Sequence, residues 1–422
     1  MTGSGAGYAI VPGGYNGDVA VLRGPRLLSG VSDPRNLAAH RQRWPQPKAV
    51  SADDLVTLTG RVDLRGRGGA AFPFSRKLAT AQSSGRKRAV VLNASEGEPG
   101  SAKDSALLLT VPHLALDGAV LVARSLGVDV VHVVVPGERA ALRPAIDAAI
   151  AERADDGIGF SVYETSGGFV GGQARAALEL ISGRENLPVT AWTPEAMNGL
   201  RGRPTLLSNA ETFAQVAVLA SIGPAQYARA GTPEEAGTTL LTVAGDGPGA
   251  VVVEVPLGIR LAEVLDHCGH DPNSTVLMGG YHGAWLAPDE VAARRVSRAD
   301  LAAAGASLGA GVVLPVEPNA CPVELTAAIV AYLAGQSARR CGPCRNGLPA
   351  LADACAALAA GDGGRATVTR IEELCGLVKG RGACAHPDGT VRLVRSLLSA
   401  FGDEVAAHGR GGCQLRIGSV TR

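Results

Sequence analysis

The chain has 422 residues, of which 46% are hydrophobic and 19% charged, a composition typical of a globular protein with about two to four domains. Its 40 basic and 39 acidic residues almost cancel, which argues against a nucleic-acid-binding protein. The sequence has neither an apolar run of about eighteen residues nor a basic start followed by an apolar segment, so we expect a cytoplasmic protein without direct membrane insertion.

Residues 1–50 form a Gly/Pro-rich extension with little periodicity, and residues 51–232 then alternate apolar runs of strand and helix type. This alternation predicts an α/β domain with a largely parallel sheet. Proline at position 144 predicts a bend in one of the helices. The predicted strands are 88–93, 129–135 and 160–165, and the predicted helices are 112–127, 138–154 and 173–183.

Residues 238–316 change character, because short strands separated by Gly and Pro surround a single helix at 260–269. This pattern predicts a small α+β domain. Residues 320–408 then contain only helical patterns, which predicts a bundle before a Gly-rich tail at 409–422. The four predicted helices are 322–336, 345–360, 369–379 and 389–407, and "TRIE" at the start of the third resembles a capping box.

The α/β region contains two loops that can approach an anion through the backbone. "LRGRGGAAFPFSRKL" at 64–78 has Gly66, Gly68 and Gly69 close together. "TSGGFVGGQARAAL" places two glycine pairs directly before a predicted helix, whose N-terminus favours a phosphate. Each loop alone is also compatible with an ordinary surface turn.

Two polar loops follow the same pattern. "LNASEGEPG" places Glu96 and Glu98 among turn residues directly after a predicted strand, and "GRPTLLSNAET" places Ser208 and Asn209 before a helix. A solvated turn and a helix cap are the ordinary interpretations. Because ligands bind at the carboxyl ends of parallel strands, the four loops together predict a nucleotide or flavin site.

The eight cysteines lie in the last 155 residues of the chain, from Cys268 onward, and "CGPCRNG" contains Cys341 and Cys344. A thiol-exchange motif of this kind follows a strand, whereas here a predicted helix precedes it. A metal or iron–sulfur site is therefore favoured over thiol exchange, with structural zinc as a further alternative. Cys268 and Cys355 lie in apolar helical segments, where we expect inert buried thiols.

The order of these motifs resembles a known family, that of the flavin-bearing 51-kDa subunit of respiratory NADH dehydrogenase, with the matching subunits of NAD-dependent formate dehydrogenases and hydrogenases. The motifs are "RGRGGAAFP", "NASEGEPG", "GGFVGGQARAAL", "GRPTLLSNAET", a small β-rich region and "CGPCRNG". The resemblance implies a multidomain α/β fold with an FMN-binding domain, a β-grasp (SLBB-like) domain and a helical iron–sulfur domain. It also implies a diaphorase-type oxidoreductase.

In that family, hydride passes from NAD(P)H to FMN, and single electrons then pass through a 4Fe-4S cluster. The acceptor would be a ferredoxin-like protein or another redox subunit, either free or in a complex at a membrane. The resemblance implies that Glu98 and Phe72 face the nicotinamide and that Glu98 is the catalytic residue. The positions that match the cofactor-binding motifs are Gly66, Gly68, Gly69, Lys77, Asn93, Ser95, Glu96, Gly171, Gly172, Arg175, Ser208 and Asn209.

The sequence departs from the family on the dinucleotide side. Ser95 replaces an Asp, and Gln173, Ala174 and Arg175 replace a stretch with two acidic residues. An Arg near the ribose accommodates the 2′-phosphate of NADP. Three alternatives therefore stay open: NADH, NADPH, or no nicotinamide at all, in which case the chain is a degenerate electron-transfer or scaffold subunit.

The cluster motif also departs from the family. Cys341, Cys344 and Cys384 match three of its four ligands, and Ala338 occupies the position of the remaining cysteine. Because clusters usually take four protein ligands, another residue has to fill the fourth position or it stays open. His386 is the first candidate because it follows Cys384 by two residues. Further candidates are Cys375, Cys321 and Cys413.

Overall fold

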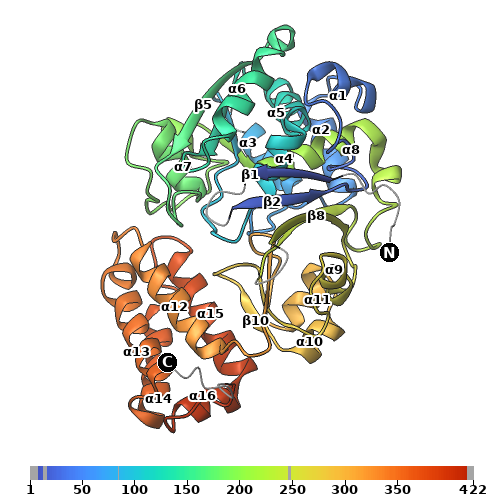
Figure 1. Cartoon of the computed structure of the whole chain (residues 1–422). Helices are drawn as coiled ribbons and strands as arrows, with labels where there is room; N and C mark the ends of the chain where they lie inside the picture. The colour runs from blue at the N-terminus through green and yellow to red at the C-terminus, as the bar shows by residue number, and fades with distance from the viewer. Residues whose placement is uncertain (1–7, 13–16, 84, 246–248, 416–422) are drawn as a thin grey trace.

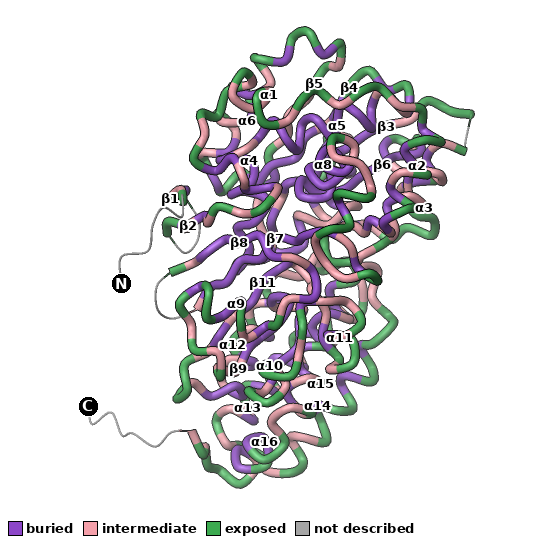
Figure 2. Tube along the Cα trace, turned by 90° about the vertical axis from the view of Figure 1, so that its right-hand side faces the viewer, coloured by how far each residue is buried: buried purple, intermediate pink, exposed green. Residues whose placement is uncertain are grey.

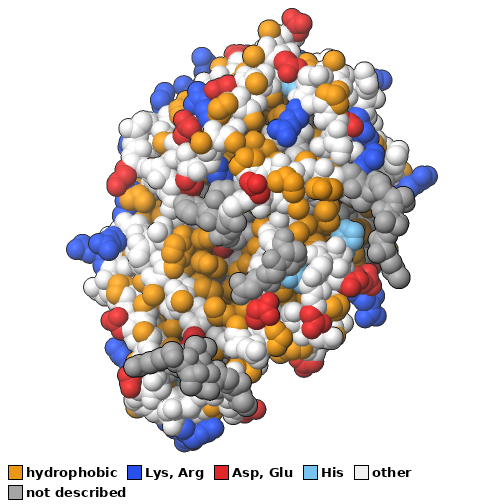
Figure 3. Space-filling view, in the orientation of Figure 1, with side chains coloured by type: hydrophobic (Ala, Val, Ile, Leu, Met, Phe, Trp, Pro, Cys, Tyr) orange, Lys and Arg blue, Asp and Glu red, His pale blue; other side chains and the backbone are white. Residues whose placement is uncertain are grey.

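The computed structural model describes residues 8–12, 17–83, 85–245 and 249–415, and it consists of three packed bodies. Figure 1 shows an α/β body at the top, a second sheet with short helices at the lower right, and a helical body at the lower left. On the face drawn in Figure 3, acidic and basic side chains are interspersed, while hydrophobic side chains gather across the middle.

The α/β body is built on a parallel four-stranded sheet of order β5-β4-β3-β6, which confirms the predicted α/β fold. The central strand β3 is buried throughout, because helices cover both of its faces (Figure 2). Val90 and Leu92 pack into one hydrophobic layer, whereas Ala89 and Val91 pack into the layer on the opposite face. The strands are β3 (Ala89–Asn93), β4 (Val130–Pro136), β5 (Gly159–Thr165) and β6 (Thr205–Asn209).

The helices of this body follow the predicted pattern, with one correction. Gly127 ends α5 in the left-handed conformation, as its position after the apolar run predicts. The predicted helix 138–154 begins only at Leu142, so Pro144 lies in the first turn, where no backbone donor is needed and no bend results. The helices are α1 (Leu37–Arg43), α2 (Ala52–Arg61), α3 (Phe74–Gln82), α4 (Lys103–Thr110), α5 (Pro112–Leu126), α6 (Leu142–Ala151), α7 (Ala174–Ile181) and α8 (Ala210–Tyr227).

The second sheet has seven strands in the order β1-β2-β8-β7-β11-β9-β10. The helix predicted at 260–269 forms as α9 (Leu261–His267), whereas β10 and two short helices were not predicted. The strands are β7 (Thr238–Val243), β8 (Ala250–Pro256), β9 (Thr275–Met278), β10 (Ala284–Leu286) and β11 (Val312–Val316), and the short helices are α10 (Pro288–Ala293) and α11 (Arg298–Ala303).

The N-terminal region supplies a hairpin that extends this sheet, where the sequence pattern predicts only a Gly/Pro-rich extension. Strands β1 (Tyr8–Pro12) and β2 (Asp18–Leu22) pair with each other, and β2 runs parallel to β8. Downstream of the hairpin, the Glu254 carboxylate of β8 accepts hydrogen bonds from the backbone N–H groups of Arg26 and Leu28. The residues between the hairpin and α1 are thereby tied to the second sheet.

The third body is helical, as predicted, with two corrections to the expected boundaries. The third predicted helix begins at Gly364, so Thr369 lies inside it and not at a capping box. The last predicted helix is interrupted at Phe401 and forms two helices. The elements are α12 (Pro322–Gly335), the π-helical turn η3 (Pro343–Gly347), α13 (Leu348–Ala360), α14 (Gly364–Val378), α15 (His386–Ala400) and α16 (Gly402–His408).

No single helix of the described residues has both the length and the apolarity to cross a membrane. The adjacent helices α4 and α5 reach both only when taken together, and they meet at an angle of 97°.

Candidate functional site

The predicted loops meet at the carboxyl edge of the parallel sheet. Asn93, at the end of β3, donates from its amide Nδ2 to the carbonyl of Gly172, 2.9 Å away. A Cβ on Gly97 would lie 2.4 Å from the carbonyl oxygen of Phe169, and a Cβ on Gly68 would lie 3.7 Å from Asn209. The loops of residues 93–100 and 165–173 can pack this closely only because glycine stands at their contacts.

Glu98 is a buried carboxyl with one unpartnered oxygen at this edge. Its Oε2 accepts a hydrogen bond of 2.9 Å from the backbone N–H of Tyr281, whereas its buried Oε1 has no partner in the described structure. Gly280 allows this approach, because a Cβ there would lie 2.6 Å from the Glu98 carboxyl. Burial raises the pKa of Glu98 to about 8, although the N–H groups of Tyr281 and Gly100 oppose the shift. An unpartnered buried acceptor is a natural partner for a ligand N–H group.

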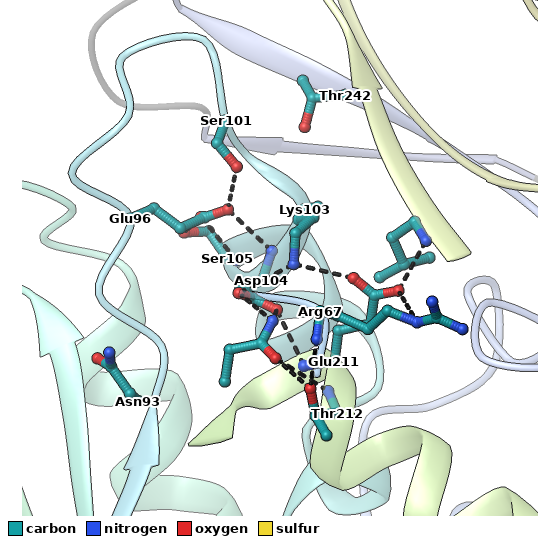
Figure 4. A network of polar contacts seen from close by, with 12 residues as sticks. Arg67, Asn93, Glu96, Ser101, Lys103, Asp104, Ser105, Glu211, Thr212 and Thr242 are labelled. Carbon is teal, nitrogen blue, oxygen red and sulfur yellow. Dashed lines mark hydrogen bonds and ion pairs between the residues drawn. The ribbon is translucent and has the colours of Figure 1, made fainter. Parts of the chain in front are cut away.

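Glu96 lies in a buried polar network and does not face open space (Figure 4). Its carboxylate accepts from the side chain of Ser101 at 2.7 Å, from the backbone N–H groups of Asp104 and Ser105 at 3.0 Å each, and from Arg139 at 2.8 Å. Burial works against ionisation, but the Arg139 and Lys103 charges prevail and lower the pKa of Glu96. Glu96 therefore stabilises the N-terminus of α4, and the structure gives it no free oxygen for a cofactor.

The same network continues beneath the glycine-rich loop. Lys103 lies 3.1 Å from Asp104 and 2.9 Å from Glu211, and the backbone N–H of Arg67 donates to Thr212 at 2.8 Å. Asn209 caps α8, and its amide nitrogen donates to the Asp104 carboxylate. The network is buried and supports the loop from below; Lys103 and Arg139 were not among the residues singled out from sequence.

An open pocket of about 330 Å³ adjoins this network on the side of the second sheet. It is bounded by Gly66 and Gly69 of the glycine-rich loop and by Gly309 and Gly311 across from them. Asn93, Glu98, Gly171 and Gly172 do not line it. Glycine backbones around a pocket and an unpartnered carboxyl oxygen fit a planar ring with N–H groups, so the residues present are compatible with a flavin.

The basic side chains expected near the cofactor are engaged within the protein. Lys77 lies 3.1 Å from the carboxylate of Glu195 and donates to the carbonyl of Leu207 at 2.9 Å. Arg175 donates to the backbone carbonyls of Thr193 and Asn198. Any phosphate at this edge would therefore depend on backbone N–H groups, unless these side chains exchange their partners.

The remaining predicted residues differ in accessibility. Phe72 is about half exposed, at 49%, and is available to a ligand. Ser208 is buried at the end of β6, whereas Ser95 donates to the side-chain oxygen of Asn93 and occupies one face of that amide.

The three predicted cluster cysteines lie together at the C-terminal end of α12. The sulfur atoms of Cys341 and Cys344 are 3.2 Å apart, and Cys384 is close enough for their charges to act on one another. Burial raises the pKa of Cys344 to about 12. Burial also opposes ionisation of Cys341, but the backbone N–H groups of Ala383 and Cys344 lower its pKa overall. Three convergent thiols of this kind fit an iron–sulfur cluster.

The structure argues against the candidates for the fourth ligand. Both ring nitrogens of His386 have partners, because Nε2 lies 2.8 Å from the carbonyl of Leu333 and Nδ1 lies 3.0 Å from Nε2 of His282. Neither lone pair of that buried ring is directed at the cysteines. Cys375 is buried within α14, and Cys321 precedes the opposite end of α12, which has 14 residues and is about 21 Å long.

A direct contact joins the glycine-rich edge to the cluster cysteines. The side chain of Gln173, which follows Gly171 and Gly172, hydrogen-bonds Cys384. Nearby, the backbone N–H of Phe169 donates to the Gln336 side chain at 3.0 Å. The Phe169 ring packs against His282 at 4.5 Å and against His386 at 5.4 Å between centroids, so all three bodies meet here. The sequence places Gln173 at a position where the family has an acid, and this departure was its only signal.

Comparisons with known proteins cover both sites. Residues 60–218 match the Nuo51 FMN-binding domain, and residues 324–408 match the NADH-ubiquinone oxidoreductase-F iron–sulfur binding region. The chain is 29% identical over 374 residues to NADH-quinone oxidoreductase F subunit 2 of Rhizobium meliloti (strain 1021), with 84% of this chain and 89% of the relative covered. It is 30% identical over 363 residues to NADH dehydrogenase (ubiquinone) flavoprotein 1, mitochondrial, of Dictyostelium discoideum, with 81% and 76% covered.

A solved structure gives the same picture. A chain of the air-oxidised NAD+-reducing NiFe hydrogenase superimposes with a TM-score of 0.83 at 27% identity, covering 92% of this chain and 68% of that one. The likeness therefore extends through all three bodies.

Proposed function

Because this chain belongs to the family of the flavoprotein (F) subunits of NADH-quinone oxidoreductase, we propose that it oxidises NAD(P)H and passes the electrons to a protein partner. When bound, FMN accepts a hydride and releases electrons one at a time, and a 4Fe-4S cluster relays single electrons. The partner is another redox subunit of a larger complex or, as the finer alternative, a free ferredoxin-like protein. The near-neutral chain then works as a peripheral subunit that reaches any membrane through its complex.

The contact between Gln173 and Cys384 is the observation that carries this proposal. It brings the loop at the flavin edge directly against a cluster cysteine, so the two cofactors would lie in neighbouring positions. Phe169 and the rings of His282 and His386 fill the surrounding space and exclude water from it. A short, dry path is what efficient one-electron transfer between the two groups requires.

Each side chain of the edge has a defined role in this proposal. The glycines at 66, 68, 69, 171 and 172 would let backbone N–H groups approach the flavin and its phosphate. Glu98 would orient the nicotinamide through its unpartnered Oε1 and, because its pKa is about 8, would be largely protonated at neutral pH. Cys341, Cys344 and Cys384 would hold the cluster, with its fourth iron open to a non-thiolate ligand.

One experiment tests the oxidoreductase proposal. The purified protein is titrated under anaerobic conditions with NADH and separately with NADPH, while the flavin and cluster absorbances are followed. We expect bleaching of both by at least one nucleotide. A coloured protein that neither nucleotide reduces would overturn the proposal.

A degenerate electron-transfer subunit without nicotinamide turnover is the second candidate. The engagement of Lys77 with Glu195 and of Arg175 with two carbonyls favours it, because both basic side chains are drawn away from a dinucleotide phosphate. This candidate predicts that reduction by dithionite succeeds where both nucleotides fail, whereas a colourless protein would indicate a scaffold without cofactors.

A further inference from the structure

A second group of metal-binding side chains lies at the opposite end of α12 from the cluster cysteines. Cys321 directly precedes α12, Glu404 and His408 lie on one face of α16, and Cys413 follows in the chain. One ligand atom from each of the four lies within 4.8 Å of all the others. We propose that these four residues bind a zinc ion, at a site independent of the flavin and the cluster.

The distances fit one tetrahedral ion. Zinc bonds of about 2.0–2.3 Å place neighbouring ligand atoms of a tetrahedron about 3.3–3.8 Å apart. The Cys321 sulfur lies 3.2 Å from His408 Nε2 and 3.8 Å from Glu404 Oε1, and His408 Nε2 lies 3.3 Å from Glu404 Oε1. The three separations already match the edges of such a tetrahedron, so the ion needs little rearrangement.

The His408 ring is held in the orientation that a metal ligand needs. Its Nδ1 lies 3.2 Å from the carbonyl of Ala359, so Nδ1 carries the proton and donates it. Nε2 is then unprotonated and directs its lone pair at the two cysteines and the carboxylate. A backbone carbonyl that fixes the second ring nitrogen in this way is characteristic of histidines that bind zinc.

The charge of the occupied site is balanced by backbone donors. Zinc with two thiolates, a carboxylate and a neutral imidazole carries one net negative charge, and both thiols release a proton on binding. Cys321 lies at the N-terminus of α12, where the N–H groups of Val323 and Glu324 hydrogen-bond its sulfur. The N–H of Gln414 donates to Glu404 at 3.2 Å. Cys321, Glu404 and His408 are buried, so water does not compete for the ion.

The donor set also selects the ion. Two sulfurs and one nitrogen favour zinc over magnesium or calcium, which take oxygen ligands. Because the ligands come from the start of α12, from α16 and from the chain beyond it, zinc would fasten the C-terminal segment to the bundle. Its role is therefore structural, as expected for a site whose four positions are all filled by protein.

The test measures zinc and iron separately in the full-length protein by elemental analysis. We expect about one zinc per chain, together with the iron of the cluster. Cys413→Ser and Cys321→Ser should each reduce zinc roughly tenfold or more and leave iron unchanged, whereas Cys341→Ser should reduce iron and leave zinc unchanged. This opposite pattern separates failure of the zinc site from failure of the cluster.

Cys355→Ser is the matched control, because Cys355 is as buried as Cys321, lies in the same hydrophobic cluster and belongs to neither site. It should retain both metals. If the cysteine variants do not fold, wild-type protein treated with a chelator is titrated with zinc instead, and uptake should release about two protons per zinc. Absence of zinc in the isolated protein together with no stoichiometric uptake would overturn the proposal, as would zinc retention in both cysteine variants.

Discussion

His282 and His386 face each other across the junction of the second sheet and the helical bundle, with Nε2 of the first 3.0 Å from Nδ1 of the second. Because His386 Nε2 donates to the Leu333 carbonyl, Nδ1 has to accept, and His282 has to donate. The pair fixes the tautomer of both rings and positions them against Phe169. It thereby connects the second sheet to the helical bundle at the point where both meet the glycine-rich edge.

Replacing His282 should weaken this junction. His282→Ala removes a buried ring and leaves Nδ1 of His386 unpartnered, so we expect a loss of about 2–4 kcal/mol in the free energy of unfolding. Urea denaturation measures it. Exposed His267, at the end of α9, is the control, and His267→Ala should change stability by less than about 0.5 kcal/mol. Equal effects for the two variants would contradict a role of the pair in holding the bodies together.

Glu98 predicts a specific pH dependence of the flavin-free protein. Its pKa is about 8 in the folded chain, against an ordinary value of 4.5, so the folded state binds its proton more tightly. The stability that this proton contributes is present below pH 4.5 and is lost as the pH rises toward 8. Each pH unit in this window should cost about 1.4 kcal/mol at most.

Glu98→Gln isolates that contribution, because glutamine retains an acceptor for the Tyr281 N–H but does not titrate. We expect the thermal midpoint of the variant to fall less steeply between about pH 5 and about pH 8, and its oxidation of NAD(P)H to fall by about 100-fold or more. Parallel pH profiles for wild type and variant would show that Glu98 ionises normally.

Ala338→Cys should complete the cluster motif. A cysteine here stands three residues before Cys341, as in the resembling family, and Ala338 packs against the bundle near the other ligands. A fourth thiolate should slow the loss of cluster absorbance in air several-fold. Ser337→Cys, one residue out of register, is the control. An unchanged half-life for Ala338→Cys would mean that another group already fills the position.

The buried pair of Arg139 and Glu96 should matter far more than its exposed neighbour. Arg139→Met leaves the Glu96 carboxylate buried without its charge partner, so we expect a loss of about 3–5 kcal/mol in the free energy of unfolding. Arg143→Met breaks the exposed pair with Asp147 and should cost less than about 1 kcal/mol. Urea midpoints compare the two directly. Similar costs would contradict the structural role assigned to Glu96.

Local patterns carried most of the fold. The apolar run of β3 and the glycine after α5 each specify their element without reference to the rest of the chain. The hairpin of β1 and β2 was not predicted, because its pairing partner β8 lies more than two hundred residues away. The capping box at Thr369 was wrong because a favourable start signal does not prevent a helix from beginning earlier.

The site was predictable to the level of loops but not of individual contacts. Glycine spacing located the edge, and cysteine spacing located three thiols that the fold brings together. Sequence could not reveal that Glu96 is consumed by Arg139, that both nitrogens of His386 are occupied, or that Gln173 contacts Cys384. Such contacts depend on side-chain directions that only the packed bodies define.

The hairpin at the N-terminus has a practical consequence for any shortened form of the protein. Strand β2 occupies one side of β8, and Val19 and Val21 bury their side chains as it does so. A truncation that starts at residue 51 would expose the backbone donors and acceptors of β8 as a free edge, and would take away two donors to Glu254. An uncovered edge of this kind recruits strands from other copies of the chain. Such a truncated protein should therefore precipitate, even though every residue assigned to flavin, cluster and zinc remains.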